Sequence, residues 1–180
     1  MAQSDQELVG LCRDGHPEIF RNLVTRYETS LLRHLTGRLG NRHNASEATQ
    51  ETFVRAYFSL ERLRNTASFS AWLFGIADRV ALEMRRSDQK FATAVLDDVA
   101  AEESGENAET GQTVDATLFQ TVQELPDTYR NVVLLRFYGG QSCEDIAENL
   151  SIPLGTVTSR LSRAYVLLRQ KLAALKTEGE

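Results

Sequence analysis

The sequence predicts an all-α protein made of two small helical domains, 1–90 and 114–180, joined by a flexible acidic linker, 91–113. Apolar residues recur at spacings of three and four along most of the chain, as in amphipathic helices, whereas strand-like alternation is almost absent. All three prolines stand where a helix should begin, a position that tolerates their missing N–H. The segment between the two domains lacks this periodicity and is rich in acid, so it divides the chain.

The N-terminal domain contains four stretches with helical periodicity. They span 4–13, 17 to about 37–40, 44 to about 60, and 68–86. Asn44 is followed three residues later by Glu47, which resembles a capping pair at the start of the third helix. The second stretch is expected to bury Phe20, Leu23, Val24, Tyr27, Leu31 and Leu35. The fourth repeats the pattern with Phe69, Trp72, Leu73, Ile76, Val80 and Met84.

The linker is recognised by its charge and by its lack of apolar residues. From Phe91 to Tyr129 there are nine acidic residues and no basic one. Its centre, 100–111, has no aromatic or large aliphatic residue, so it cannot bury enough apolar surface to offset the entropy of folding. Removing these nine charges from the net charge of −5 leaves +4, which indicates two mildly basic domains.

A helix-turn-helix is predicted in the C-terminal domain. A helix from Asp127 ends at the glycine pair 139–140, and a further helix begins near Ser142. Pro153 interrupts that helix and suits the first turn of the next one, while the small Ala147 allows a close crossing. The last helix should bury a continuous stripe of Val157, Leu161, Ala164, Leu168, Leu172 and Leu175.

The opposite face of this last helix is suited to nucleic acid. Between residues 149 and 177 there are five basic residues and no acidic one. Hydroxyl and guanidinium groups near a helix N-terminus can contact phosphates and read base edges in a major groove. The candidate DNA-binding residues are Thr156, Thr158, Ser159, Arg160, Ser162 and Arg163. The alternative interpretation is that Arg160 and Arg163 only form a solvated helix face.

Other functional classes have little support in the sequence. No apolar run could span a membrane and no signal-peptide pattern is present, so we expect a cytoplasmic protein without membrane insertion. Cys12 and Cys143 stand apart, which favours buried free thiols over a redox pair. The three histidines lack metal-ligand spacing, and there is no phosphate-binding loop or nucleophile motif. We expect no metal, no cofactor and no enzymatic activity.

Two segments of the chain resemble a known family. ELPDTYRNVVLLRFYGGQSCEDIAENLSIPLGTVTSRLSRAYVLLRQKL is similar to region 4 of the bacterial extracytoplasmic-function sigma factors of the sigma-70 family. FRNLVTRYETSLLRHL, QETFVRAY and WLFGIA are similar to their region 2, and the order of the two regions is that of the family. The resemblance implies a subunit that binds core RNA polymerase, recognises and opens a promoter, and is held inactive by an anti-sigma factor.

The resemblance also assigns roles to residues by position. Core polymerase would contact Glu47, Gln50, Glu51, Phe53 and Val54. The single-stranded −10 element would be bound by Arg64, Asn65, Ser68, Phe69, Arg79, Arg85 and Arg86, with a flipped base received by the loop that ends at Phe69. The −35 duplex would be read by the six residues named above for the last helix. The acidic linker would enter a cationic channel of the polymerase.

This chain also departs from the family pattern. The segment before Phe53 reads SEATQE, with Ser46, Ala48 and Thr49 where the family has acidic and aliphatic residues. Gly75 and Arg79 replace the usual Arg and Asn, Thr158 replaces a basic residue, and Tyr165 replaces a frequent Arg. These changes predict that the −10 preference and the −35 affinity differ from the family norm.

Three functional hypotheses follow from these patterns. The first is a sigma factor. The second is a stand-alone helix-turn-helix regulator that binds a palindromic duplex without polymerase. The third is a sigma-like decoy that occupies a partner without reading DNA. Individual assignments also have structural alternatives, because Phe69, Trp72 and Phe74 could be ordinary core residues, and Glu47 and Glu51 could be merely solvated.

Overall fold

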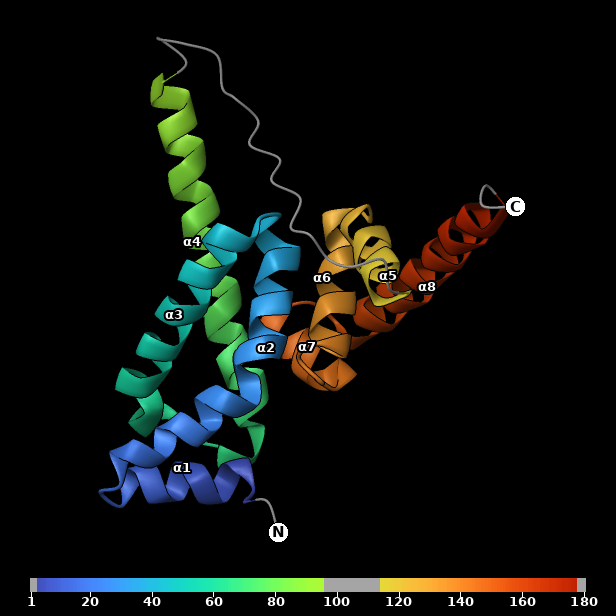
Figure 1. Ribbon diagram of the computed structural model, residues 1–180. Coiled ribbons are helices and arrows are strands. Elements are labelled where there is room, and N and C mark those ends of the chain that lie inside the picture. Colours follow the sequence, from blue (N-terminus) through green and yellow to red (C-terminus); the bar gives the residue numbers. More distant parts are fainter. Residues whose placement is uncertain (1–2, 96–113, 178–180) are drawn as a thin grey trace. The chain divides into compact units, whose positions relative to one another are not determined.

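The chain folds into two compact units, Met1–Asn107 and Ala108–Glu180, which we call unit 1 and unit 2 (Figure 1). The structure, a computed structural model, describes residues 3–95 and 114–177. All regular structure in these residues is helical, which confirms the predicted all-α class with two helical domains. The predicted flexible linker falls mostly on 96–113, which lies outside the described residues.

The described part of unit 1, residues 3–95, consists of four α-helices and three short 3₁₀ helices. In chain order they are α1 (Asp5–Arg13), η1 (Pro17–Ile19), α2 (Phe20–Leu39), α3 (Arg42–Ser59), η2 (Leu60–Arg62), η3 (Thr66–Ser68) and α4 (Phe69–Val95). Ser4 caps α1 in a capping box with Glu7. The expected start of α3 was wrong: the helix begins at Arg42, and the side chain of Asn41 accepts the hydrogen bond from the backbone N–H of Asn44. Asn44 is therefore inside the first turn and is not the cap.

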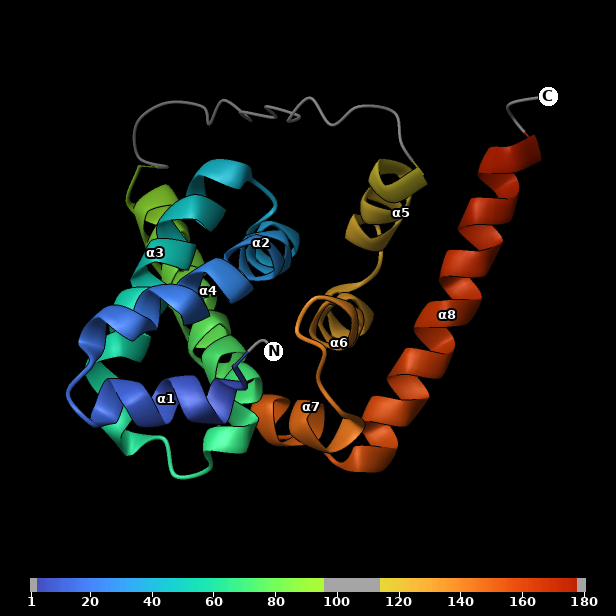
Figure 2. The ribbon, with the colours of Figure 1, turned by 60° about the horizontal axis from the view of Figure 1, so that its bottom comes forward.

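The core of unit 1 lies where α2, α3 and α4 pack on one another, with α1 crossing one end of the bundle (Figures 1 and 2). Leu23, Leu31 and Leu35 of α2 are fully buried there, as predicted. Val24 and Tyr27 are only partly buried. The Tyr27 hydroxyl donates to Asp5, and burial together with this carboxylate raises the pKa of Tyr27 far above its usual value.

A buried ionic cluster joins α2 to α4. His34 is fully buried, and its Nε2 lies 2.9 Å from Oδ1 of Asp78. Arg38 places Nε 3.0 Å from the same oxygen. The His34 ring also packs edge-on against Phe74, with 5.1 Å between ring centroids. Burial by itself would raise the pKa of Asp78, but the charges and hydrogen bonds of His34 and Arg38 outweigh it and hold that pKa below its ordinary value of 3.8.

Helix α4 is longer than the sequence predicted. It continues to Val95, so residues 91–95 belong to the helix and not to the linker. At 1.5 Å per residue its 27 residues extend about 40 Å. From Leu82 to Lys90 only Met84 is partly buried, and Figure 1 shows this end of α4 extending past the other helices of unit 1.

Residues 114–177, the described part of unit 2, form four helices. They are α5 (Val114–Gln123), α6 (Asp127–Phe137), α7 (Cys143–Leu150) and α8 (Leu154–Thr177). Figure 2 shows α7 and α8 meeting steeply through a tight turn, as a helix-turn-helix requires. Ser142 caps α7 in a capping box with Asp145. Ser151 ends α7 in the left-handed conformation, with φ of 52°.

The core of unit 2 forms between α8 and the other three helices. Val157, Leu161, Ala164 and Leu168 are buried, which confirms most of the predicted stripe. Leu175 was placed in this stripe wrongly, because its side chain is 48% exposed. The repeat of apolar residues along α8 continues beyond the part of this helix that packs against the other helices of unit 2. The repeat alone does not show where that packing ends.

Candidate nucleic-acid and protein interfaces

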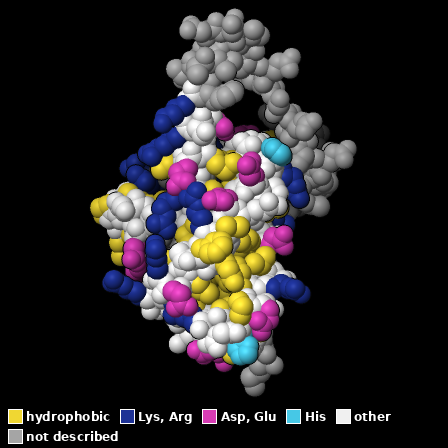
Figure 3. Space-filling model, turned by 90° about the vertical axis from the view of Figure 1, so that its left-hand side faces the viewer, with side chains coloured by type: hydrophobic (Ala, Val, Ile, Leu, Met, Phe, Trp, Pro, Cys, Tyr) yellow, Lys and Arg dark blue, Asp and Glu magenta, His cyan; other side chains and the backbone are white. Residues whose placement is uncertain are grey.

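The residues that the sequence assigned to polymerase binding gather on one side of unit 1. Four of the five line a groove of about 330 Å³ between α3 and α4, which we call the α3–α4 groove. It is formed by Glu47, Gln50, Glu51, Val54, Arg55, Val80, Glu83 and Met84. Figure 3 shows a patch of hydrophobic side chains on the left-hand side of the molecule as seen in Figure 1, with acidic and basic side chains around it. An acidic and apolar groove of this kind suits a protein partner better than it suits nucleic acid.

Arg55 organises the α3–α4 groove. Its Nε lies 2.6 Å from Oε1 of Glu51 and its NH1 lies 2.8 Å from Oε2 of Glu83, so one guanidinium joins the two helices. The hydrogen bond that Arg55 donates to Glu51, reinforced by the one it donates to Glu83, raises the pKa of Arg55. Sequence reasoning missed this residue, although the spacing of four between Glu51 and Arg55 is the signal of a helical ion pair.

Phe53 does not belong to this surface, although the sequence placed it there. Its side chain is only 9% exposed and packs into the core of unit 1. A helix turns by 100° per residue, so Phe53 and its neighbour Val54, which is 50% exposed, point in different directions. We therefore remove Phe53 from the candidate contacts.

The loop expected to receive a flipped base, Arg64–Phe69, follows η2 and contains η3. Arg64 and Asn65 are exposed, and Asn65 Nδ2 donates to Ser68 Oγ over 3.0 Å. The loop is anchored by Arg13, whose NH2 donates to the carbonyl oxygens of Leu60 and Leu63 over 2.6 and 2.5 Å. These contacts fix the backbone of the loop while its polar side chains remain accessible.

Phe69 is a correction to the predicted base-binding set. Its side chain is fully buried and its ring packs against those of Tyr27 and Trp72, with centroids 5.6 and 5.8 Å away. The ring therefore has no face available to a base, and the core interpretation of Phe69 holds. Trp72 is partly exposed and lies next to it.

Three of the four arginines assigned to the −10 strand lie on α4. Arg79, Arg85 and Arg86 are all exposed. Arg79 and Arg86 are seven residues apart and share one face, and Arg85 lies about 100° away from Arg86. The structure thus separates this set into a polar loop at the start of α4 and a basic face further along the helix.

Four of the six residues predicted to read duplex DNA lie together at the start of α8. They border a groove of about 440 Å³, the α6–α8 groove, which is lined by Thr128, Tyr129, Gly155, Thr156, Ser159, Arg160 and Arg163. Thr158 and Ser162 are exposed but lie outside it, and the Thr158 hydroxyl donates to the carbonyl of Gly155. Within residues 3–95 and 114–177, Arg160 and Arg163 have no ion-pair partner, so both guanidinium groups are available to bind an anionic ligand such as a phosphate.

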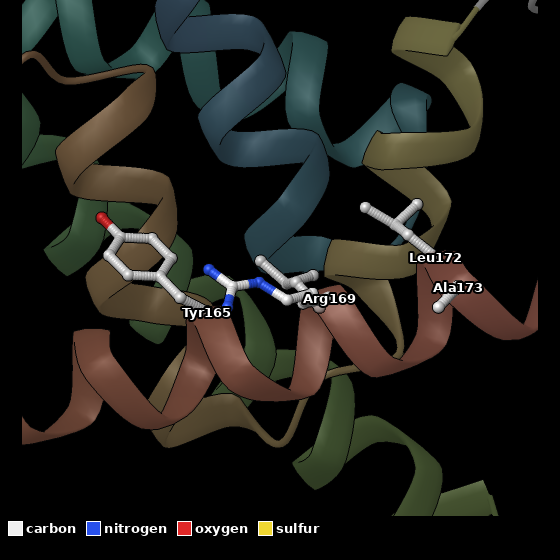
Figure 4. Close-up of a pocket in the computed structure, with 5 residues that line it drawn as sticks. Tyr165, Arg169, Leu172 and Ala173 are labelled. Carbon is white, nitrogen blue, oxygen red and sulfur yellow. The ribbon is translucent and has the colours of Figure 1, made fainter.

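A second groove on α8 is largely apolar. Its volume is about 420 Å³ and it is lined by Tyr165, Leu168, Arg169, Leu172 and Ala173. Figure 4 shows Tyr165, Arg169 and Leu172 following one another along the helix. Tyr165 also packs edge-on against Phe137 of α6, with ring centroids 6.3 Å apart. Tyr165, which stands where the family frequently has Arg, therefore forms part of an apolar surface.

Neither cysteine is fully buried, in contrast to the expectation. Cys12 and Cys143 are free thiols of intermediate exposure. Burial, assisted by the nearby charge of Glu18, raises the pKa of Cys12, which disfavours the reactive thiolate. No cluster of possible metal ligands occurs in the part of the chain that the structure describes. Within the same residues, no helix is long and apolar enough to cross a lipid bilayer.

Comparison with known proteins identifies the family. Sigma-70 region 2 matches residues 23–91 and Sigma-70, region 4 matches residues 116–168. The chain is 31% identical to the RNA polymerase sigma-H factor of Pseudomonas aeruginosa, over 98% of each protein. It is 30% identical to the ECF RNA polymerase sigma-E factor of Haemophilus influenzae, over 96% of this chain and 97% of the relative. The chain belongs to the extracytoplasmic-function (ECF) sigma factors of the sigma-70 family.

Two solved structures share the fold of this ECF sigma factor. One is CnrH in complex with the cytosolic domain of CnrY, with a TM-score of 0.69 and 22% identity over 96% of this chain and 99% of that one. The other is the sigma factor RpoE in complex with the anti-sigma factor NepR from Bartonella quintana, with a TM-score of 0.72 and 20% identity over 86% and 96%. At these identities the likeness establishes the fold.

Family membership decides between the functional hypotheses. An ECF sigma factor is a transcription initiation factor that joins RNA polymerase to a promoter, and bond formation belongs to the polymerase. The interpretation as a sigma factor without enzymatic activity is confirmed by the family, and the stand-alone regulator loses its support.

Proposed function

We propose that the two units divide promoter recognition between them. Unit 2 binds the −35 duplex through the start of α8, and unit 1 binds core polymerase through the α3–α4 groove and the −10 strand through the loop and outer face of α4. The observation that carries this proposal is the α6–α8 groove, which gathers Thr156, Ser159, Arg160 and Arg163 on one helix face. Phe53 and Phe69 are left out because both are buried.

The chemistry of the α6–α8 groove supports duplex binding. Thr156 and Arg160, like Ser159 and Arg163, are four residues apart on α8, so hydroxyl and guanidinium groups alternate along one face. Arginine can bind the O6 and N7 atoms of guanine together, and hydroxyl groups bind either phosphates or bases. This face of α8 would bind in the major groove of the duplex.

Different chemistry supports single-strand binding by unit 1. The exposed Arg64 and Asn65 precede α4, and Arg79 and Arg86 continue along it. Opened DNA needs cations for its backbone and polar groups for its unstacked bases, and this sequence of residues offers both. With Phe69 in the core, base recognition rests on the polar loop residues and the partly exposed Trp72.

Regulation by an anti-sigma factor and action in the cytoplasm complete the proposal. CnrH and RpoE, which share the fold, were both solved with a protein partner: the cytosolic domain of CnrY in one case and the anti-sigma factor NepR in the other. Core polymerase and promoter DNA occur together in the bacterial cytoplasm, which is where this function would be exerted.

Transcription reconstituted from purified components tests the whole proposal. The chain is mixed with bacterial core polymerase and a library of duplex promoters, and the transcripts are sequenced. We expect start sites at a fixed distance from a shared two-part element. Polymerase binding without transcripts would favour the decoy, and duplex binding that ignores polymerase would restore the stand-alone regulator.

Arginine variants of α8 test the −35 assignment. Arg160→Ala and Arg163→Ala should each weaken binding to the duplex selected above and lower the salt slope of the affinity by about one unit if a phosphate contact is lost. Arg169→Ala is the matched control, because it removes the same charge from the same helix at a position outside the α6–α8 groove, about 180° from Arg160 and about 120° from Arg163. Equal losses in all three variants would show that only net charge matters.

A further inference from the structure

Phe58 is exposed without an evident reason inside unit 1. Its side chain is 80% exposed, the largest value among the large hydrophobic residues of the described chain. It packs edge-on against Tyr57, with ring centroids 5.5 Å apart, and Tyr57 packs edge-on against Phe20 at 5.3 Å. Most of the Phe58 ring meets water, and with the adjoining Tyr57, which is 43% exposed, it forms a contiguous exposed apolar patch of the kind that marks interaction sites.

Phe58 lies on the same face of α3 as three of the candidate polymerase contacts. Phe58 follows Val54 by four residues, Glu51 by seven and Glu47 by eleven, which places all four on one face of the helix. We call these residues the α3 stripe. Val54 is itself 50% exposed, so the stripe changes from acidic at its start to apolar at its end.

The charges around the stripe restrict the kind of partner. Arg55 is held by Glu51 and Glu83, so the guanidinium is already paired. Glu47 and Gln50 are exposed at one end. Glu61, whose side chain is 78% exposed although it lies 4.0 Å from Nε of Arg13, lies beyond the other. An apolar centre with acidic and amide groups at its edges fits a surface that presents an apolar side chain flanked by lysine or arginine.

We propose that Phe58 is an anchoring contact to core RNA polymerase. The inference rests on the proposed function of α3 and adds to it a residue that the sequence pattern did not include. Its ring would enter an apolar pocket of the polymerase, while Glu47 and Gln50 would bind polar and basic groups beside that pocket. A few buried aromatic residues commonly carry most of the affinity of an interface, and Phe58 has the exposure and the support from Tyr57 that such a residue needs.

Binding of the full chain to purified core polymerase, with no DNA present, tests this assignment. We expect Phe58→Ala to raise the dissociation constant by about 30-fold, in the range of interface hot spots. Phe58→Leu should retain most of the affinity, because the pocket still receives an apolar side chain. Leu82→Ala is the control: Leu82 is 45% exposed on α4 and does not line the α3–α4 groove. Its affinity should equal that of the wild type.

Folding and function can be separated in the same experiment. Phe58 is mostly exposed, so Phe58→Ala should leave the unfolding of unit 1, followed by Trp72 fluorescence, unchanged. If Gln50→Ala weakens binding and Phe58→Ala does not, this inference fails while the proposed function stands. If the wild type does not bind polymerase at all, both fail.

Two further outcomes would also overturn the inference. Equal losses in Phe58→Ala and Leu82→Ala would mean that binding follows general surface hydrophobicity. A wild-type dimer that becomes monomeric in Phe58→Ala, with unchanged affinity for polymerase, would mean that a second copy of the chain covers the ring. Sedimentation velocity of each variant alone distinguishes this last case.

Discussion

The two units bury polar groups in different ways. Unit 1 encloses a charged cluster, in which Asp78 bridges His34 and Arg38 between two helices. Unit 2 buries neutral groups: Gln141 accepts a hydrogen bond from Asn149 over 2.8 Å, and Thr121 donates to its own helix over 2.7 Å. Buried charges need their partners, because an unpaired charge in a core is very unfavourable, whereas an unpaired neutral group such as Nε2 of Gln141 costs much less. The folding of unit 1 should therefore depend on charge and pH more than that of unit 2.

Removing the central carboxylate should have the largest effect on stability. Asp78→Asn leaves His34 and Arg38 buried without their shared counterion, and we expect a loss of about 3–5 kcal/mol in the free energy of unfolding of unit 1. Trp72 is the only tryptophan, so its fluorescence during urea unfolding reports on unit 1. Asp88→Asn, an exposed change on the same helix, should lie within about 0.5 kcal/mol of the wild type. A loss of similar size in both variants would contradict the importance of the cluster.

A backbone clash should destabilise unit 2 without affecting unit 1. A Cβ atom at Gly139 would lie 2.6 Å from the carbonyl oxygen of Leu135, a backbone atom that cannot move aside easily. Gly139→Ala should cost about 1–3 kcal/mol, as overpacking does in other cores. Circular dichroism should show the helices of unit 2 unfolding earlier, while the Trp72 transition stays where it is. A shift of both transitions together would show that the two units unfold as one.

Sequence reasoning succeeded where structure is specified locally. The helix-turn-helix was predicted with correct element order because Ser142, Pro153 and the glycine pair 139–140 act on their immediate neighbours. Four residues of the polymerase set, which the resemblance assigned, line the α3–α4 groove, and four of the duplex-binding set line the α6–α8 groove, because residues three and four apart share a helix face.

Failures occurred where the direction of a side chain depends on distant packing. Phe53 and Phe69 were assigned to binding surfaces because the family resemblance places them in binding segments, but the placement of α3 and α4 against the bundle turns both rings inward. The pairing of His34 with Asp78, 44 residues apart, has no local signal at all. The contact of Arg55 with Glu83 is missed for the same reason, although its contact with Glu51 is local.

Acid should weaken unit 1 through Asp78. The pKa of Asp78 is lowered on folding, so below its ordinary value of 3.8 the unfolded chain binds this proton before the folded one does. The stabilisation by Asp78 is complete above that pH and is lost as the pH falls towards the lower pKa of the folded state. The difference in unfolding free energy between the wild type and Asp78→Asn should therefore shrink as the pH is lowered below about 4. A difference that stays constant down to pH 2 would show that Asp78 does not titrate as described.

The smallest expected effect is a gain of stability in the turn of unit 2. Ser151 ends α7 with φ of 52°, a left-handed conformation that is unfavourable for residues with a Cβ atom. Glycine adopts it freely, although it loses more backbone entropy on folding, so Ser151→Gly should stabilise unit 2 by about 0.5–1 kcal/mol. The backbone N–H of Ser151 already donates to the carbonyl of Glu148 over 3.2 Å, and that bond does not need the side chain. Thermal unfolding by circular dichroism should show the increase, and the Trp72 signal should not change. Ser162→Gly, in the interior of α8, is the opposite control and should lower the stability of the same unit by a similar amount.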